Sequence, residues 1–552
     1  MIDCNRLTEL KSSDEPHCVI DVREWGEFAQ GHIPGSSTLP RGALERYLTL
    51  LVPDRAVELV VYCDDGRRSG LAALTAAGLG YARVSVLDGG LEQWQAAGGE
   101  VVRGFALRGR AYGERLLVEE RLPEISAEQL HEWIAAKREI HLVDVRPRDE
   151  YLREHLPGAI NIQLADIPSR SDALIAGSQS PIITQCAGRT RSIIGAHILR
   201  RMNPDREVYA LRGGTHAWKL AGWDNELEQG ETKASLPESA HAARDFADRV
   251  LREDRLARIT PAEFMRWIEE GKFSYLIDVR GFEDYRRGHI PGARYCDATQ
   301  APFVIENIVG VAQAPIVVSG SRESAAILVA AALSKMDYPR VYVMAGGVEA
   351  WQTARLPLEA EAPAEIDFGG PEWLLRFSMP GIPADAMRPL AIPLTNQDRQ
   401  AAHFVSPREL RASLSGPNPP RVIDLRCIGD FALSHVPGAR WIARGRLELE
   451  YAAAGPADGE VVIYCRRGDI SVLAARTLRE LGYTRVAILE GGFNAWRGES
   501  FELEEGLGDQ SQFEALAKEE VFIANPGPYG FTKQRAASFL AWEERLGDRY
   551  QR

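Results

Sequence analysis

The segment that decides the fold runs from residue 181 to residue 199, with the sequence PIITQCAGRTRSIIGAHIL. It begins with a short apolar run, residues 181–184, whose β-branched side chains are typical of a buried strand. It ends in apolar residues at helical spacing after Ser192, a residue type that often caps a helix. Cys186 opens the loop between them. The segment therefore predicts a strand, a cysteine loop and a helix.

The loop has the features of an anion site. A loop that curls into a helix N-terminus directs several backbone N–H groups inward, and the helix dipole adds positive potential. A cysteine in such a field is expected to be a thiolate, because the field lowers its pKa. Arg189 and Arg191 add fixed positive charge. We therefore expect a reactive sulfur anion at Cys186 beside a bound oxyanion.

Bulk properties narrow the function classes. A chain of 552 residues suggests about four domains, and a net charge of −13 argues against a general nucleic-acid or membrane-surface binder. The seven dispersed cysteines form no CxxC pair, so we expect neither a metal site nor a disulfide framework, and no cofactor is indicated. The N-terminus lacks the features of a secretory signal. Free thiols then favour the cytoplasm.

Self-comparison shows one unit repeated four times. The first signature reads DVREWGEFAQGHIPGS from Asp21, DVRPRDEYLREHLPGA from Asp144, DVRGFEDYRRGHIPGA from Asp278 and DLRCIGDFALSHVPGA from Asp424. A second signature closes each copy: LDGGLEQW at 87–94, LRGGTHAW at 211–218, MAGGVEAW at 344–351 and LEGGFNAW at 489–496. These are repeats of a whole domain.

Each copy alternates strands and helices, which predicts an α/β fold: four tandem domains, each a mainly parallel sheet with helices on both faces. The cysteine loop then lies at the carboxyl end of a central strand, where such sheets bind ligands. The expected boundaries are 1–105 for domain 1, 120–225 for domain 2, 255–358 for domain 3, 359–402 for a connector, 403–500 for domain 4, and 501–552 for a tail packed on the body.

The two signatures and the strand–cysteine–loop–helix order resemble the rhodanese superfamily. Four copies look like a multidomain rhodanese-type sulfurtransferase, each domain rhodanese-like. The resemblance implies catalytic cysteines that cycle between thiolate and persulfide. They would move a sulfane sulfur from thiosulfate or a related donor to cyanide or a thiol. Because the Cys186 loop is rich in arginine, we expect thiosulfate to add sulfur at Cys186 and cyanide to remove it. The implied partners are small sulfur-containing anions and thiol acceptors, with a protein acceptor as a further candidate.

The resemblance, matched position by position onto this sequence, gives the candidate site residues. The cysteines are Cys63, Cys186 and Cys465, and the substrate-binding candidates are Gly66, Arg67, Arg68, Gly188, Arg189, Thr190, Arg191, Arg466, Arg467 and Gly468. Two acidic residues, Asp64 and Asp65, follow Cys63 and should disfavour an anionic donor there, whereas Arg466 and Arg467 should favour one at Cys465. Domain 3 has no cysteine in this loop, so we expect a folded but inactive copy.

Two other function classes are considered. A dual-specificity phosphatase of the same fold needs an arginine six residues beyond the cysteine, where this chain has Ser69, Ser192 and Ser471. A persulfide carrier or redox adaptor for protein partners stays open. The histidines of the HxPG turns and the aspartates of the DVR motifs recur in domain 3, which favours structural roles for them. The donor, the acceptor, the dominant loop and the oligomeric state are left open by the sequence.

Overall fold

The computed structural model describes residues 1–225, 236–321, 323–360, 402–450, 458–523 and 533–547 of the chain. These residues form two compact units, one with residues 1–105 and 402–523, the other with residues 106–360 and 533–547. Domains 1 and 4 therefore belong to the first unit, and domains 2 and 3 to the second. Most of the expected connector, residues 361–401, lies outside the described residues.

Each domain contains one parallel sheet. The strand orders are β2-β1-β3-β4, β5-β9-β8-β6-β7, β10-β14-β13-β11-β12 and β15-β19-β18-β16-β17. The strands are β1 His17–Asp21, β2 Ser37–Thr38, β3 Glu58–Tyr62, β4 Val84–Val86, β5 Glu124–Ile125, β6 His141–Asp144, β7 Ile160–Asn161, β8 Ile182–Gln185, β9 Val208–Leu211, β10 Ala257–Ile259, β11 Tyr275–Asp278, β12 Arg294–Tyr295, β13 Ile316–Ser319, β14 Val341–Met344, β15 His403–Val405, β16 Arg421–Asp424, β17 Arg440–Trp441, β18 Val461–Tyr464 and β19 Val486–Leu489. In domain 1 the fifth strand is reduced to one parallel bridge, between Ile2 and Leu87.

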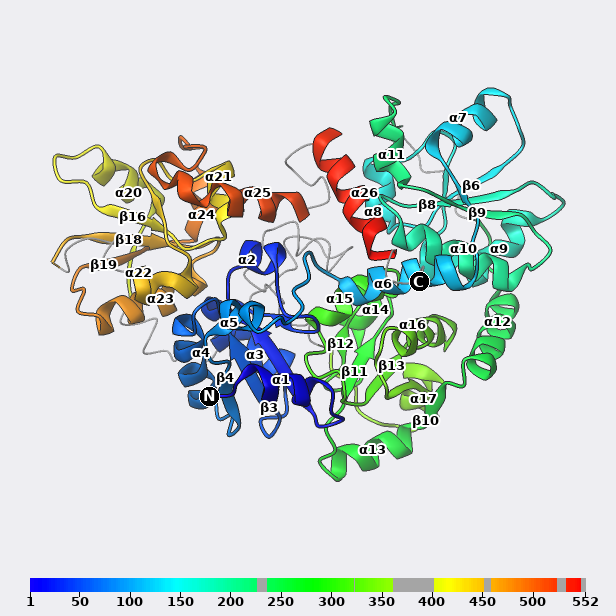
Figure 1. Cartoon of the computed structure of the whole chain (residues 1–552), viewed down its shortest axis with the longest axis horizontal. Helices are drawn as coiled ribbons and strands as arrows, with labels where there is room; N and C mark the ends of the chain where they lie inside the picture. The colour runs from blue at the N-terminus through cyan, green and yellow to red at the C-terminus, as the bar shows by residue number, and fades with distance from the viewer. Residues whose placement is uncertain (226–235, 322, 361–401, 451–457, 524–532, 548–552) are drawn as a thin grey trace. The chain divides into compact units, whose positions relative to one another are not determined.

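Helices cover both faces of each sheet, as the sequence predicts (Figure 1). In domains 1 and 2 they are α1 Cys4–Lys11, α2 Trp25–Gln30, α3 Leu44–Leu51, α4 Arg67–Gly78, α5 Gly90–Ala96, α7 Ala127–Ala135, α8 Arg148–Arg153, α9 Ile167–Ile175, α10 Thr190–Met202 and α11 Gly214–Leu220. In domains 3 and 4 they are α13 Pro261–Glu269, α14 Phe282–Arg287, α15 Ala301–Val304, α16 Glu323–Lys335, α17 Gly347–Thr353, α20 Pro407–Leu414, α21 Ile428–Leu433, α22 Leu447–Glu450, α23 Asp469–Glu480 and α24 Gly492–Gly498. Among the described helices, none is both long and apolar enough to cross a membrane.

The central strands are apolar because they are buried on both faces, as parallel strands between two helix layers must be. The strand before each site loop, such as β3 or β18, has almost no exposed side chain. The tryptophan of each closing signature is buried, as expected for a core residue. Its indole N–H donates to the carbonyl six residues later, which fixes the chain as it leaves the domain; the acceptors are Glu100, Asp224, Pro357 and Glu502.

In the first unit, domains 1 and 4 meet through equivalent segments. Each contributes an Arg-Gly turn, and the two turns pack against each other with Gly42 close to Gly445. Two reciprocal ion pairs flank this contact, Arg41 with Glu448 at 2.6 Å and Arg444 with Glu45 at 3.5 Å. The contact therefore has approximate two-fold symmetry and uses the same repeat position on both sides.

The second unit pairs domains 2 and 3 through linker helices. Helix α6, Leu107–Glu119, precedes domain 2 and contacts α10 of domain 2 and α15 of domain 3. Helix α12, Ala240–Glu253, precedes domain 3 and contacts α16 of domain 3 and α9 of domain 2. Each linker helix therefore joins the domain that follows it to the other domain of the unit.

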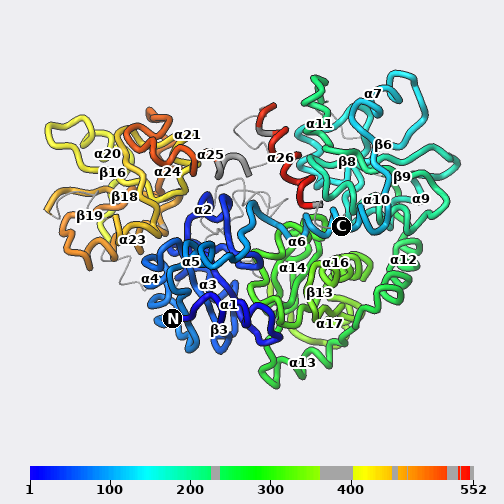
Figure 2. Tube along the Cα trace, viewed as in Figure 1, coloured from blue at the N-terminus to red at the C-terminus, as the bar shows by residue number. Residues whose placement is uncertain are grey.

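The described part of the tail consists of two helices. Helix α25, Glu514–Ile523, packs on α2 and α21 in the first unit. Helix α26, Lys533–Gly547, packs on α6 and α11 in the second unit, and the trace in Figure 2 shows it beside both. The tail thus contributes one helix to each unit.

Candidate functional site

The three candidate cysteines occupy one structural position. Cys63, Cys186 and Cys465 directly follow the central strands β3, β8 and β18 and are buried at the floor of their loops. The carbonyl of each accepts a hydrogen bond of 2.8–2.9 Å from the helix of the closing signature, with Leu91, Thr215 and Phe493 as donors. The second signature therefore fastens the cysteine loop to its own domain.

A glycine is required at this fastening point. Gly492 has a φ of +60°, and a Cβ added to it would lie 2.3 Å from the carbonyl oxygen of Cys465. Gly90 and Gly214 make the same close approach to Cys63 and Cys186. The glycine pair of the signature thus serves two purposes, a left-handed turn and close contact with the cysteine backbone.

In domain 3 the position of the cysteine is taken by Gly320. Its carbonyl accepts from Val348, as the cysteine carbonyls do in the other domains, and Ser319 before it pairs with Asp278 in the sheet. Helix α16 begins three residues after Gly320, whereas the helices of the other loops begin four residues after the cysteine. This domain therefore has no side chain at the nucleophile position.

The Cys465 loop directs a backbone donor at sulfur. The N–H of Gly468 donates to the Cys465 Sγ at 3.1 Å, and helix α23 begins at the next residue. Arg466 forms an ion pair of 2.6 Å with the buried Asp430. Arg467 is half-buried at the same loop. The sulfur therefore receives a hydrogen bond at the positive end of a helix, which favours an anionic form.

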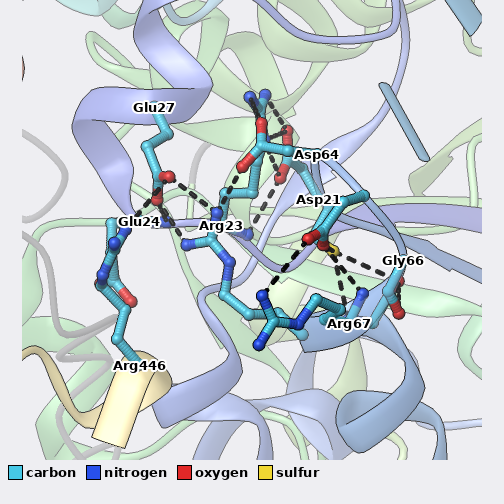
Figure 3. A network of polar contacts seen from close by, with 12 residues as sticks. Asp21, Arg23, Glu24, Glu27, Asp64, Gly66, Arg67 and Arg446 are labelled. Atoms are coloured by element: carbon cyan, nitrogen blue, oxygen red, sulfur yellow. Dashed lines mark hydrogen bonds and ion pairs between the residues drawn. The ribbon is translucent and has the colours of Figure 1, made fainter. Parts of the chain in front are cut away.

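The Cys63 loop has a different charge pattern. The Cys63 thiol donates to the carboxylate of Asp65, with 3.6 Å from Sγ to Oδ1. Asp64, in contrast, is held by Arg23 at 2.9 Å and by Arg68 at 2.6 Å; Figure 3 shows Asp64 and Arg23 in this network. The charge of Asp64 is therefore compensated, and Asp65 is the carboxylate that faces the sulfur.

The Cys186 loop is enclosed. Arg191 is buried in an ion pair of 2.6 Å with Glu150, and Arg189 is buried against Glu114 at 2.8 Å. Burial raises the pKa of the Cys186 thiol, with the charge of Arg191 acting in the opposite direction. This differs from the expected thiolate, because desolvation outweighs a positive charge that neighbouring carboxylates already neutralise.

In each of the three cysteine loops, one arginine is held by an acidic residue that sequence reasoning missed. Glu27 accepts two hydrogen bonds from Arg68, at 2.6 and 2.7 Å. Glu150 does the same for Arg191, and Asp430 receives Arg466. The signal was present, because every repeat has an acidic residue six positions after its first aspartate. These arginines are anchored to their own domains and are not loose rim charges.

The remaining substrate-binding candidates differ in position and exposure. Gly66 and Gly468 have φ of +89° and +105° and precede the first helical residue of α4 and α23. Arg67 is exposed, 4.0 Å from Asp65. Thr190 donates its hydroxyl to Glu543 at 3.2 Å. The helix of this loop begins at Thr190 and its N-cap is Arg189, so the cap expected at Ser192 is wrong by three residues.

The aspartate of the DVR motif and the histidine of the HxPG turn both have structural roles, as expected. Asp21 receives the guanidinium of Arg23 at 2.7 Å, and the other three domains repeat the pair. His32 stacks on Phe28 and bonds to its carbonyl at 2.9 Å through Nδ1, and burial lowers the pKa of His32 to about 3. Cys18 lies outside the site loops, and burial raises the pKa of its thiol to about 12, which disfavours a thiolate there.

Comparison with known proteins agrees with this geometry. A family model described as "Rhodanese-like domain" matches residues 4–97, 126–221, 260–354 and 406–499. The thiosulfate:glutathione sulfurtransferase of Saccharomyces cerevisiae is 33% identical over 17% of this chain and 76% of its own length. The thiosulfate sulfurtransferase GlpE of Ectopseudomonas mendocina is 41% identical over 17% of this chain and 84% of its own.

A solved structure matches the whole chain. The crystal structure of a thiosulfate sulfurtransferase from Pseudomonas aeruginosa has a TM-score of 0.77 and 27% identity, and the match covers 99% of this chain and 97% of that one. The family match covers all four repeats, including the one without a cysteine. Four parallel α/β domains, three of them with a cysteine at the carboxyl end of the central strand, place the chain in the rhodanese-like sulfurtransferase family.

Proposed function

We propose that the chain moves a sulfane sulfur from thiosulfate or a related donor to cyanide or a thiol through a cysteine persulfide. Cys465 is the principal carrier in this proposal, and Cys63 and Cys186 are further carriers. The observation that carries it is the Gly468 N–H, 3.1 Å from the Cys465 Sγ. The names of the yeast and Ectopseudomonas relatives, both thiosulfate sulfurtransferases, support the same donor.

In the first half-reaction the Cys465 thiolate attacks the outer sulfur of thiosulfate. A bond forms between the two sulfurs, the sulfur–sulfur bond of the donor breaks, and sulfite leaves with the bonding electron pair. The protein keeps the sulfur as Cys–S–S⁻, and total charge is conserved. The Gly468 N–H and the start of helix α23 stabilise the negative sulfur without reorganisation.

In the second half-reaction an acceptor attacks the outer sulfur of the persulfide. The persulfide bond breaks, Cys465 returns to a thiolate, and the product is thiocyanate from cyanide or a persulfide from a thiol. Because sulfur is held covalently between the two steps, we expect ping-pong kinetics.

A second candidate is a persulfide carrier that serves protein acceptors. Domain 3 keeps the full fold with Gly320 in place of the nucleophile, which favours a binding role for that copy. In this function sulfur still loads on the cysteines, but the acceptor is a partner's cysteine. Turnover with cyanide or glutathione would then be a minor activity.

The test is a thiosulfate:cyanide assay on Cys465→Ala, with Cys18→Ala as the matched control of another buried cysteine. We expect Cys465→Ala to lose most of the turnover and the control to keep it. Full turnover in Cys465→Ala would refute Cys465 as the principal carrier. Loading of sulfur without turnover on either small acceptor would favour the carrier function, and a protein-acceptor pull-down would then separate the two.

A further inference from the structure

Helix α26 seats a carboxylate on the Cys186 loop. Glu543 is 2% exposed, and its Oε1 accepts hydrogen bonds from Thr190 and from Arg110 of α6. Its other oxygen, Oε2, has no hydrogen-bond partner among the described residues. A buried carboxylate oxygen without a donor is costly, so its position needs an explanation.

The unpartnered oxygen faces the loop. A Cβ built on Gly188 would lie 2.6 Å from Glu543 Oε2 and 3.1 Å from the ring of Phe539 on the same helix. Gly66 stands one position further along the Cys63 loop, and a Cβ built on it would meet nothing within 4 Å. The Cys186 loop is thus covered by a side chain from the chain terminus, and the charge on this cover is negative.

The cover is fastened at several points. Arg110 lies over the rings of Phe539 and Trp542, and Glu544 pairs with Arg212 of the closing turn at 2.7 Å. Phe539 also packs edge-on against His216 of α11. These contacts come from α6 and from the closing signature with its helix α11, so α26 is packed firmly in the second unit.

We propose that α26 closes the Cys186 site and that the carboxylate of Glu543 excludes anionic donors from it. This inference rests on the proposed sulfur transfer: thiosulfate then reacts at Cys465 but is excluded from Cys186. A donor with negative oxygens would have to enter beside a carboxylate that already holds the Thr190 hydroxyl and lies against Gly188. Arg189 and Arg191 are buried against Glu114 and Glu150. Arg110 pairs with Oε1 of Glu543 on the side of α6, so the oxygen that lies against Gly188, Oε2, is the one without a donor in the described part of the chain.

The test uses the full chain with Cys63 and Cys465 changed to serine. The rates at which Cys186 reacts with iodoacetamide, which is neutral, and with iodoacetate, which is anionic, are followed on its peptide by mass spectrometry. Glu543→Gln keeps the size and an acceptor oxygen. Glu544→Gln is the control, since it removes an equal charge from the next residue, which pairs with Arg212 at 2.7 Å and lies 3.5 Å from Arg189 but does not lie against Gly188.

We expect Glu543→Gln to raise the iodoacetate rate at Cys186 by about tenfold and the iodoacetamide rate by much less. Glu544→Gln should change both rates by less than about threefold. An unchanged ratio of the two rates in Glu543→Gln, or an equal shift in the control, would overturn the proposal.

Thiosulfate loading of Cys186 in the same variants links the inference to sulfur transfer. We expect Glu543→Gln to load Cys186 about tenfold faster than the background chain. Alkylation does not require sulfur transfer, so a shifted alkylation ratio without loading would contradict the proposed function at Cys186 and still support the role of Glu543. Loading that is rapid with Glu543 intact would contradict the closure.

Discussion

The charge at Asp65 sets how readily the Cys63 site accepts thiosulfate. In a chain that keeps only Cys63 of the three loop cysteines, the change Asp65→Asn should raise kcat/KM for thiosulfate. The carboxylate accepts from the Cys63 thiol at 3.6 Å, so a thiolate there lies next to a negative charge. Asparagine keeps the oxygen that accepts from the Arg67 N–H at 3.0 Å, so the loop turn should persist.

The magnitude follows from the distance. Two unit charges 3.6 Å apart repel by about 5 kcal/mol at an effective dielectric constant of 20, and by about 1 kcal/mol in bulk water. The Asp65 side chain is 46% exposed, which favours the lower part of this range. A change of about 1.4 kcal/mol corresponds to a factor of ten. We therefore expect about a tenfold rise at low salt and a smaller one at high salt.

The assay is steady-state thiosulfate:cyanide transfer at two salt concentrations. Asp54→Asn is the matched control, because it also removes one carboxylate from domain 1 but precedes strand β3, at the opposite end from Cys63. If Asp65→Asn and Asp54→Asn gave equal rates, or if the gain persisted at high salt, the charge argument would be wrong.

Three further outcomes are expected. Gly492→Ala should lower the free energy of unfolding by at least about 2 kcal/mol more than Gly438→Ala in urea denaturation, since both have positive φ but only the first meets backbone within 2.3 Å; equal losses would contradict the role of the close approach. Burial and the neighbouring charge of Glu27 raise the pKa of Glu24 to about 7, so its contribution to stability is complete below pH 4.5 and is lost as pH rises through 7. Glu24→Gln should remove up to about 3 kcal/mol of this pH dependence, and identical pH profiles of stability for the two chains would rule it out. Changing all three loop cysteines to alanine should abolish sulfur transfer with the circular dichroism spectrum unchanged, and residual turnover would reveal another nucleophile.

The repeat and its sheet could be predicted because they depend on local patterns. Apolar runs, the DVR and HxPG motifs and the closing glycines specify each domain within about one hundred residues, and all four sheets agree with them. The position of Cys186 after its strand followed from the same pattern. Helix boundaries were less certain, since α10 begins at Thr190 with no side-chain cap.

The surroundings of the cysteines could not be read from the local sequence. Glu543 lies more than three hundred residues from Thr190 along the chain, and no sequence motif predicts that they are in contact. Arg191 looked like a free cation beside the sulfur, but its partner Glu150 comes from another element of the fold. Burial and charge compensation depend on how distant segments pack against the loop. The loop's own residues therefore do not determine the reactivity of its cysteine.

The most direct test of the account is peptide mass spectrometry of the whole chain after brief exposure to thiosulfate and again after cyanide. We predict that the Cys465 peptide gains one sulfur atom first, that the Cys63 peptide follows more slowly, and that cyanide removes both. The Cys186 peptide should stay unmodified over the same interval. An unmodified Cys465 in a chain that loads sulfur at Cys186 or turns over thiosulfate would contradict the central claim.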